Sequence, residues 1–184
     1  MESLKPGHYW KTPFIWEAGC PEPRPGALRF AEASPEWLAT AIGRVMASSS
    51  DPSDRFAVDR HGAAGATDEL LGLAPEYFTW LPAWWQVART DEGAEVGFVL
   101  PVLFKDERRN RNGQPQGTVF YMGVLPEHRG RGYGGELLAQ ATRIFIGARC
   151  WRIFCDTGTD NAPMVRAFRK AGYIERTPWQ RPLA

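Results

Sequence analysis

Residues 125–135 read LPEHRGRGYGG and lie between an expected strand over 118–124 and an expected amphipathic helix over 132–148. A glycine-rich turn that leads into the N-terminus of a helix presents unpaired backbone N–H groups to one point, and the helix dipole adds positive potential there. Glycine allows a ligand to approach the backbone closely, and Arg129 and Arg131 add positive charge. A purely structural turn needs fewer glycines than this segment has. The segment therefore predicts a phosphate-binding loop.

Two common nucleotide-binding motifs fit this loop poorly. Gly130–Gly135 formally matches G-x-G-x-x-G, and Asp156 lies about 20 residues farther on, as in dinucleotide-binding domains. However, Leu125–Arg129 separate the glycines from the strand, and the 28 residues after Asp156 are too few for the rest of a doubly wound sheet. A Walker loop would need Gly-Lys-Ser/Thr, which the segment lacks. A nucleotide-dependent oxidoreductase therefore remains the weakest alternative.

Read as R-x-x-G-x-G, with Arg129, Gly132 and Gly134 at its fixed positions, the loop resembles the cofactor motif of the GCN5-related N-acetyltransferase (GNAT) family. Members of this family bind acetyl-coenzyme A. A second block, residues 161–173 with Asn161, Phe168 and Tyr173, is similar to the family's later helix-and-strand motif. The resemblance is close over 118–184 and compatible over 27–104.

The resemblance implies an α/β (α+β) fold, with a mixed, mostly antiparallel sheet and flanking helices. Its central strands, 118–124 and 151–155, would run parallel, splay apart and be joined by helix 132–148 as a right-handed crossover.

The remaining segments supply elements compatible with this fold. Upstream we expect a strand at 27–30, a helix that starts at Ser34, a short helix over 67–73 that Pro75 stops, and an antiparallel hairpin of 84–90 with 94–104. Downstream we expect a helix that starts at Asp160 or Asn161 and ends at Gly172, and a last strand over 173–183 that two prolines break. Residues 48–66 and 105–117 are polar and are expected to form loops. Residues 1–25 are rich in proline and aromatic residues and show no helical or strand periodicity. We expect residues 26–184 to form a single acetyltransferase domain and residues 1–25 to form an extension that packs on this domain or on a second subunit.

The resemblance also implies where acetyl-coenzyme A would bind. Pantetheine would pair with the backbone of residues 122–124, pyrophosphate would contact the amides of 129–134, Asn161 would hydrogen-bond the pantetheine arm and Phe168 would pack near the thioester. Asn161 as a plain helix cap and Phe168 as an ordinary core residue are the alternatives. The implied cofactor residues are Met122, Gly123, Val124, Arg129, Gly130, Arg131, Gly132, Tyr133, Gly134, Asn161 and Phe168.

The catalytic residues depart from the family pattern. In the family a neutral amine attacks the thioester directly, and a backbone amide stabilises the oxyanion; the matching amide here is that of Val124. Phe168 stands where the family commonly has a tyrosine that protonates sulfur, and Thr118 stands where some members have a basic glutamate. Tyr121 as acid and Asp156 as base through water are candidate replacements, although Tyr121 also fits a core aromatic and Asp156 a turn residue.

These departures leave two functions open. A positioned general acid contributes about 10²–10⁴-fold, so its loss need not abolish activity. The chain is therefore expected to transfer acetyl from acetyl-coenzyme A to a primary amine of a small molecule or peptide. A catalytically weak acyl-coenzyme A-binding or sensing protein of the same fold is the alternative.

Charge and composition limit the kinds of binding partner that we expect for this chain. The net charge is only +1, but residues 1–117 carry net −4 and residues 118–184 net +5, which fits an anionic partner for the C-terminal third rather than bulk nucleic acid. Three cysteines at unrelated spacings predict neither disulfides nor a metal site. The absence of an apolar run of 18 residues and of an apolar N-terminal stretch predicts a cytoplasmic protein without a membrane span, and a homodimer remains open.

Overall fold

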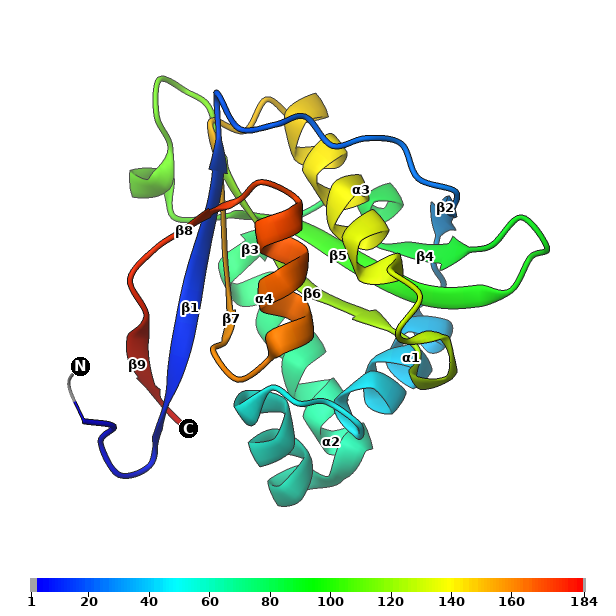
Figure 1. Ribbon diagram of the computed structural model, residues 1–184, viewed down its shortest axis with the longest axis vertical. Coiled ribbons are helices and arrows are strands. Elements are labelled where there is room, and N and C mark those ends of the chain that lie inside the picture. Colours follow the sequence, from blue (N-terminus) through cyan, green and yellow to red (C-terminus); the bar gives the residue numbers. More distant parts are fainter. Residues whose placement is uncertain (1–2, 184) are drawn as a thin grey trace.

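The strand that precedes the glycine loop, β6 (Gln116–Val124), lies inside one mixed sheet in the computed structural model, which describes residues 3–183 (Figure 1). The strand order is β2-β4-β5-β6-β7-β1-β8, with β3 paired to β5 and β9 paired to β1. The other strands are β1 (His8–Glu17), β2 (Arg29–Glu32), β3 (Phe78–Thr79), β4 (Gln86–Arg89), β5 (Glu95–Phe104), β7 (Arg152–Gly158), β8 (Ile174–Glu175) and β9 (Trp179–Pro182). Within the described residues only β6 and β7 pair in parallel, so the predicted mixed, mostly antiparallel sheet is confirmed.

The parallel pair β6–β7 opens along its length. Its register contains two residue pairs, Gln116 with Arg152 and Gly117 with Ile153, at the beginning of both strands. Farther along, the Val119 N–H meets the Cys155 Sγ atom at 3.5 Å in place of a backbone carbonyl. The strands therefore splay apart toward their carboxyl ends, as predicted, and leave unpaired backbone on the inner edge of β6.

Two pairs of helices cover opposite faces of the sheet (Figure 1). The helices are α1 (Pro35–Met46), α2 (Pro52–Tyr77), α3 (Tyr133–Gly147) and α4 (Ala162–Lys170). Side chains alternate across β5, so Val99 packs under α3 and α4, whereas Phe98 and Leu100 pack against α1 and α2. The crossover helix and the helix that begins after Asn161 thus form where they were predicted.

The expectation of a loop over 48–66 is wrong, because α2 begins at Pro52. Asp51 caps it by accepting a hydrogen bond from the Ser53 N–H at 3.0 Å, and Pro52 occupies the first turn. Gly62 interrupts the helix with φ of 69°, and Pro75 lies inside the helix. Helix start signals and helix-breaking residues lie close together in this segment, so its composition resembles that of a loop.

The expectation that residues 1–25 contain no strand is also wrong. β1 pairs antiparallel with β7 over seven residues and carries β8 and β9 on its other edge. Phe14, Ile15 and Trp16 are all buried, because this strand is covered on both faces and therefore lacks an alternating pattern. The last strand is divided into β8 and β9, with Pro178 in the break between them as predicted, whereas Pro182 does not break a strand but is the last residue of β9. The boundary between an extension and a domain at residue 26 stays a prediction.

Candidate functional site

The glycine loop has the conformation that only glycine adopts without strain. Gly130 and Gly132 have φ values of 78° and 85°, and Gly132 is the N-cap of α3. Throughout residues 3–183 no acceptor contacts the N–H groups of residues 130–134. Unpaired donors beside the positive end of the α3 dipole are the arrangement that favours an anion.

Gly134 and Gly135 have a different reason to be glycine. Both have ordinary helical backbone, and an added Cβ would meet no atom within 4 Å in the described part of the chain. Internal packing therefore does not require glycine there. The open space at the helix N-terminus leaves room for a ligand to approach the backbone closely.

Arg129 does not point its charge into the loop. Its guanidinium donates to the carbonyl oxygens of Ser48 at 2.8 Å and Val45 at 3.3 Å, at the C-terminal end of α1, and its Nε donates to Val124 O at 3.2 Å. Arg129 therefore fixes the loop against α1 and β6. Arg131 is exposed and lies outside the cavity lining described next.

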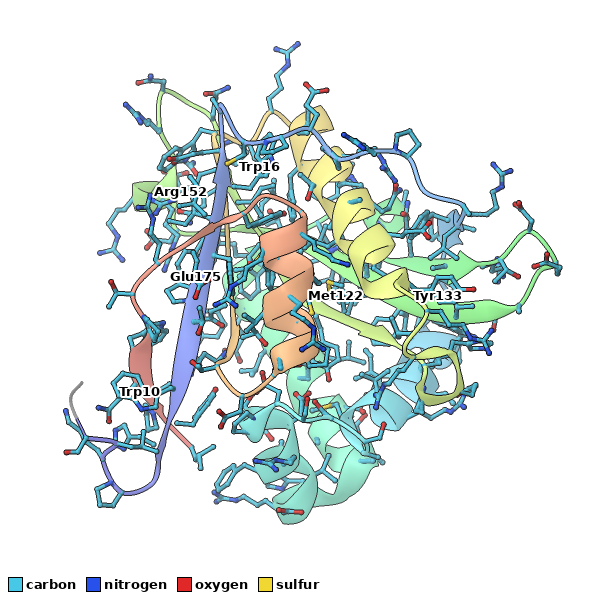
Figure 2. All side chains as sticks on the ribbon, viewed as in Figure 1. Trp10, Trp16, Met122, Tyr133, Arg152 and Glu175 are labelled. Atoms are coloured by element: carbon cyan, nitrogen blue, oxygen red, sulfur yellow. The ribbon has the colours of Figure 1, made fainter. Side chains whose placement is uncertain are left out.

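One cavity of about 1630 Å³ connects the glycine loop to the gap between β6 and β7. Met122, Gly123 and Val124 line it, followed by Tyr133 at the start of α3; Figure 2 labels Met122 and Tyr133. The missing side chain of Gly123 makes room for Val45, since a Cβ would lie 2.5 Å from its Cγ1 atom. Side chains along the whole of α2, together with residues 179–183, line the cavity as well. The loop and the edge of β6 thus share one space.

Asn161 and Phe168 line the same cavity from the second motif. Asn161 is the N-cap residue of α4, but its side chain makes no cap hydrogen bond; its Oδ1 accepts weakly from Ser50 at 3.4 Å. The amide is therefore available to a ligand. Phe168 is 2% exposed, stacks on Phe14 with ring centroids 4.6 Å apart and lies edge-on to Tyr173. Its ring is both core and cavity wall.

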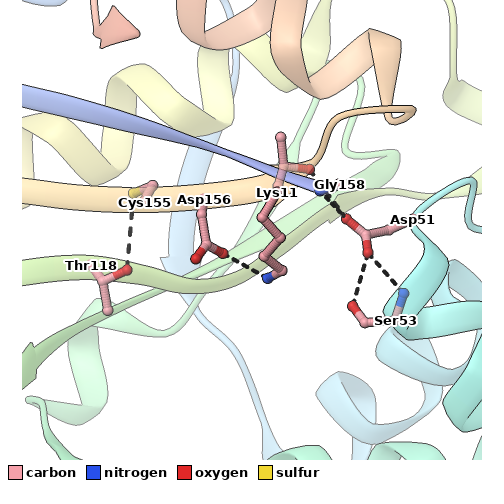
Figure 3. A network of polar contacts seen from close by, with 8 residues as sticks. Lys11, Asp51, Ser53, Thr118, Cys155, Asp156 and Gly158 are labelled. Atoms are coloured by element: carbon pink, nitrogen blue, oxygen red, sulfur yellow. Dashed lines mark hydrogen bonds and ion pairs between the residues drawn. The ribbon is translucent and has the colours of Figure 1, made fainter. Parts of the chain in front are cut away.

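A partly buried polar network crosses from β1 to α2 (Figure 3). Lys11 Nζ pairs with Asp156 Oδ1 at 2.6 Å. Burial alone would lower the pKa of Lys11, but the Asp156 carboxylate reverses this and raises the pKa above its ordinary value. Asp51 accepts from the Gly158 N–H at 2.8 Å and from Ser53; these bonds overcome the effect of burial and lower the pKa of Asp51.

Next to this network, the Tyr121 hydroxyl donates to Asp54 Oδ2 at 2.8 Å. Burial, reinforced by the Asp54 carboxylate, raises the pKa of Tyr121 well above its ordinary value. Burial also raises the pKa of Asp54, and hydrogen bonds from Ser49 and Tyr121 offset this only in part. Sequence reasoning missed Asp54 because its segment was expected to be a loop; the helix start at Asp51-Pro52 was the signal that could have placed it.

The cysteines are poor candidates for a nucleophile. Burial raises the pKa of both Cys150 and Cys155 to about 12, and the Thr118 hydroxyl faces Cys155 Sγ at 4.0 Å. Thr118 therefore supplies no base. Within residues 3–183 no three His, Cys, Asp or Glu side chains are grouped to hold a metal ion, and no helix is long and apolar enough to cross a membrane.

A splayed parallel strand pair, an unpaired amide loop at the start of the crossover helix and one shared cavity define an acyl-transfer domain of the GNAT type. Residues 51–173 match the family model described as the acetyltransferase (GNAT) family. The chain therefore belongs to this family, whose members use acetyl-coenzyme A, and the sequence-based prediction of the family is confirmed.

Individual relatives are distant. A mycothiol acetyltransferase of Corynebacterium aurimucosum is 25% identical over 138 residues, which cover 63% of this chain and 45% of that protein. A second, from Saccharomonospora viridis, is 29% identical over 87 residues, 47% of this chain and 28% of that protein. The matched part is thus less than half of either curated relative. A GCN5-related N-acetyltransferase structure from Sphaerobacter thermophilus, 16% identical, superposes with a TM-score of 0.58 and covers 95% of this chain and 52% of that chain.

Proposed function

We propose that this protein transfers the acetyl group of acetyl-coenzyme A to a primary amine of a small molecule or peptide. The observation that carries the proposal is the single cavity that joins the unpaired amides of residues 130–134 to the buried polar groups Tyr121, Lys11 and Asp156. An acyl donor held at the first end would present its thioester to an acceptor at the second.

The binding assignments follow the geometry of the cavity. The amides of 130–134 would hold the pyrophosphate, and the edge of β6 at Met122–Val124 would pair with the pantetheine amides. The side-chain amide of Asn161 would hydrogen-bond the same arm. Holding both reactants in one space replaces a bimolecular encounter by an intramolecular one, which supplies much of the rate.

For the chemical step we assign oxyanion stabilisation to the Val124 N–H. Asp156 is less suited to act as a base, because it is paired with Lys11 at 2.6 Å. Tyr121 is less suited to protonate sulfur, because its hydroxyl already donates to Asp54. We therefore expect the thiol, with an ordinary pKa near 8.5, to depart as the thiolate without a dedicated acid.

The test is release of free thiol from acetyl-coenzyme A by the purified protein in the presence of an amine panel. The curated relatives are named mycothiol acetyltransferases, so small-molecule amines come first in the panel and peptides second. Amine-dependent thiol release, with mass spectrometry of the acetylated product, is the expected result. Binding of coenzyme A without turnover of any amine would contradict the proposal.

One observation favours a second function. The ring of Phe168 packs between Phe14 and Tyr173 and carries no hydroxyl, so the acid that is common in the family is missing. A weakly catalytic acyl-coenzyme A-binding protein would show this departure too. Such a protein would bind acetyl-coenzyme A and fail with the whole amine panel.

A further inference from the structure

Four carboxylates line the cavity within residues 3–183: Asp51, Asp54, Glu69 and Asp156. Asp51 is held by the Gly158 N–H and by Ser53, and Asp156 is paired with Lys11. Glu69 is exposed and lies 3.7 Å from His61. Only Asp54 combines burial, at 9% exposure, with the lack of a cationic partner or a backbone donor among the described residues.

The position of Asp54 relative to β6 is defined by Tyr121. The Tyr121 hydroxyl donates to Oδ2 at 2.8 Å, and Tyr121 directly precedes the segment 122–124 that we assign to pantetheine. Tyr121 belongs with the side chains packed against α1 and α2, the helices that carry and precede Asp54. Asp54 thus faces the cavity beside β6, the strand that we propose binds the acyl donor. It lies on the opposite side of the sheet from α3 and α4.

We propose that Asp54 accepts the proton of the acceptor ammonium and that Tyr121 positions it for this task. The inference rests on the proposed function. It assigns the general base, because position 118, where some family members have a basic glutamate, is a threonine here. A buried carboxylate without a cation is also a site that favours a cationic acceptor over a neutral one.

The ammonium gives one proton to the Asp54 carboxylate, and the neutral amine then attacks the thioester carbon. The new C–N bond forms and the C–S bond breaks, with the sulfur leaving as thiolate. The second proton of the nitrogen reaches that sulfur, and Asp54 returns its proton to solvent. The products are the acetamide, coenzyme A and one proton.

Four neighbouring groups control the ionisation of Asp54. Asp51, at the start of the same helix, raises the pKa of Asp54 in addition to burial, whereas hydrogen bonds from Ser49 and Tyr121 and the more distant charge of Lys11 on β1 lower it. Arg129 acts on the Tyr121 end of the pair. Because the Tyr121 hydroxyl stabilises the charged carboxylate, its removal should raise the pKa of Asp54 further.

The charged form of Asp54 works against folding. Its pKa is higher in the folded than in the unfolded chain, so stability falls as the pH rises through the folded value and the buried group ionises. Asp54→Asn should therefore be at least as stable as the parent at pH 7. A destabilising group of this kind is typical of sites kept for activity.

The experiment compares Asp54→Asn with Asp59→Asn, the same change at an exposed position of α2. With an amine that the parent acetylates, kcat for Asp54→Asn should fall by about 10²–10⁴-fold at pH 7, and the deficit should shrink toward the pKa of the amine near 10. Asp59→Asn should match the parent, and coenzyme A affinity by calorimetry should be the same in all three. Tyr121→Phe should move the acidic limb of kcat/KM to higher pH.

The outcomes separate the two proposals. An active parent whose Asp54→Asn variant keeps the same kcat and pH profile overturns the role of Asp54 alone. The same holds for a variant in which only the KM of the amine changes. A parent that binds coenzyme A but acetylates no amine overturns the proposed function and the role of Asp54 with it.

Discussion

The guanidinium of Arg129 donates to the carbonyl oxygen of Ser48 at 2.8 Å, which joins the glycine loop to the residue just past the end of α1. Its second nitrogen reaches Val45 O at 3.3 Å. A cation at the C-terminal end of a helix satisfies carbonyls that have no partner within the helix. The motif arginine therefore sets the position of the loop, while the unpaired loop amides are the groups that we propose bind phosphate.

Arg129→Ala should destabilise the protein by about 1–2 kcal/mol, because the carbonyl oxygens of Ser48, Val45 and Val124 lose a charged donor. Arg131→Ala is the matched control: Arg131 is exposed, and its loss should change stability by less than about 0.5 kcal/mol. Denaturant unfolding of both variants measures the difference. Equal stability of the two variants would show that the contacts of Arg129 contribute nothing to the free energy of unfolding.

Phe168→Tyr should raise kcat by up to about 10²-fold, because the new hydroxyl would stand where family members commonly carry the acid that protonates the leaving sulfur. The ring is otherwise matched, so coenzyme A affinity should stay the same. Steady-state kinetics with one competent amine, together with calorimetry, test this. An unchanged kcat with intact binding would show that proton delivery to sulfur does not limit turnover.

Asp156→Asn should cost about 2–4 kcal/mol of stability, because it leaves the Lys11 ammonium buried without its counter-ion. The exposed pair Arg29–Asp91 provides the control, and Asp91→Asn should change stability by less than about 0.5 kcal/mol. Chemical denaturation at pH 7 compares them. A loss for Asp156→Asn no larger than that of the control would contradict the importance of the buried pair.

The Lys11–Asp156 pair should also make stability sensitive to alkaline pH. The pKa of Lys11 is raised in the folded protein, so its contribution is complete below the unfolded value near 10.4 and is lost as the pH rises through the folded value. The stability difference between the parent and Lys11→Met should therefore narrow above about pH 10.4. A difference that is constant from pH 8 to 11 would argue against a charged Lys11.

The part of the fold that the sequence predicted is the part with strong local signals. The glycine loop, the amphipathic pattern of α3 and the Gly172 stop after α4 all have short-range causes. β1 was missed because burial of Phe14, Ile15 and Trp16 on both faces removes the alternation that marks a strand. Its pairing with β7 joins residues more than 130 positions apart, and no local pattern records such a contact.

The candidate site was predictable only at its cofactor end. Motif spacing placed residues 129–134, but the side-chain direction of Arg129 depends on α1, which lies about 80 residues earlier. Asp54 and Lys11 come from segments read as loop and extension, so their approach to Tyr121 and Asp156 could not be inferred. Tertiary packing, and not residue type, decides which cavity carboxylate lacks a cationic partner.

The central claim is that the start of α3 binds the phosphates of acetyl-coenzyme A, and calorimetry of coenzyme A binding to Gly134→Val tests it most directly. A Cβ at position 134 meets only open space in the protein, so the branched side chain would occupy the proposed ligand site without disturbing the fold. Gly147→Val, at the far end of the same helix and equally unobstructed, is the control. We expect Gly134→Val to weaken coenzyme A binding at least about 10-fold relative to Gly147→Val. Equal affinities in the two folded variants, or tighter binding of NAD than of coenzyme A by the parent, would contradict the claim.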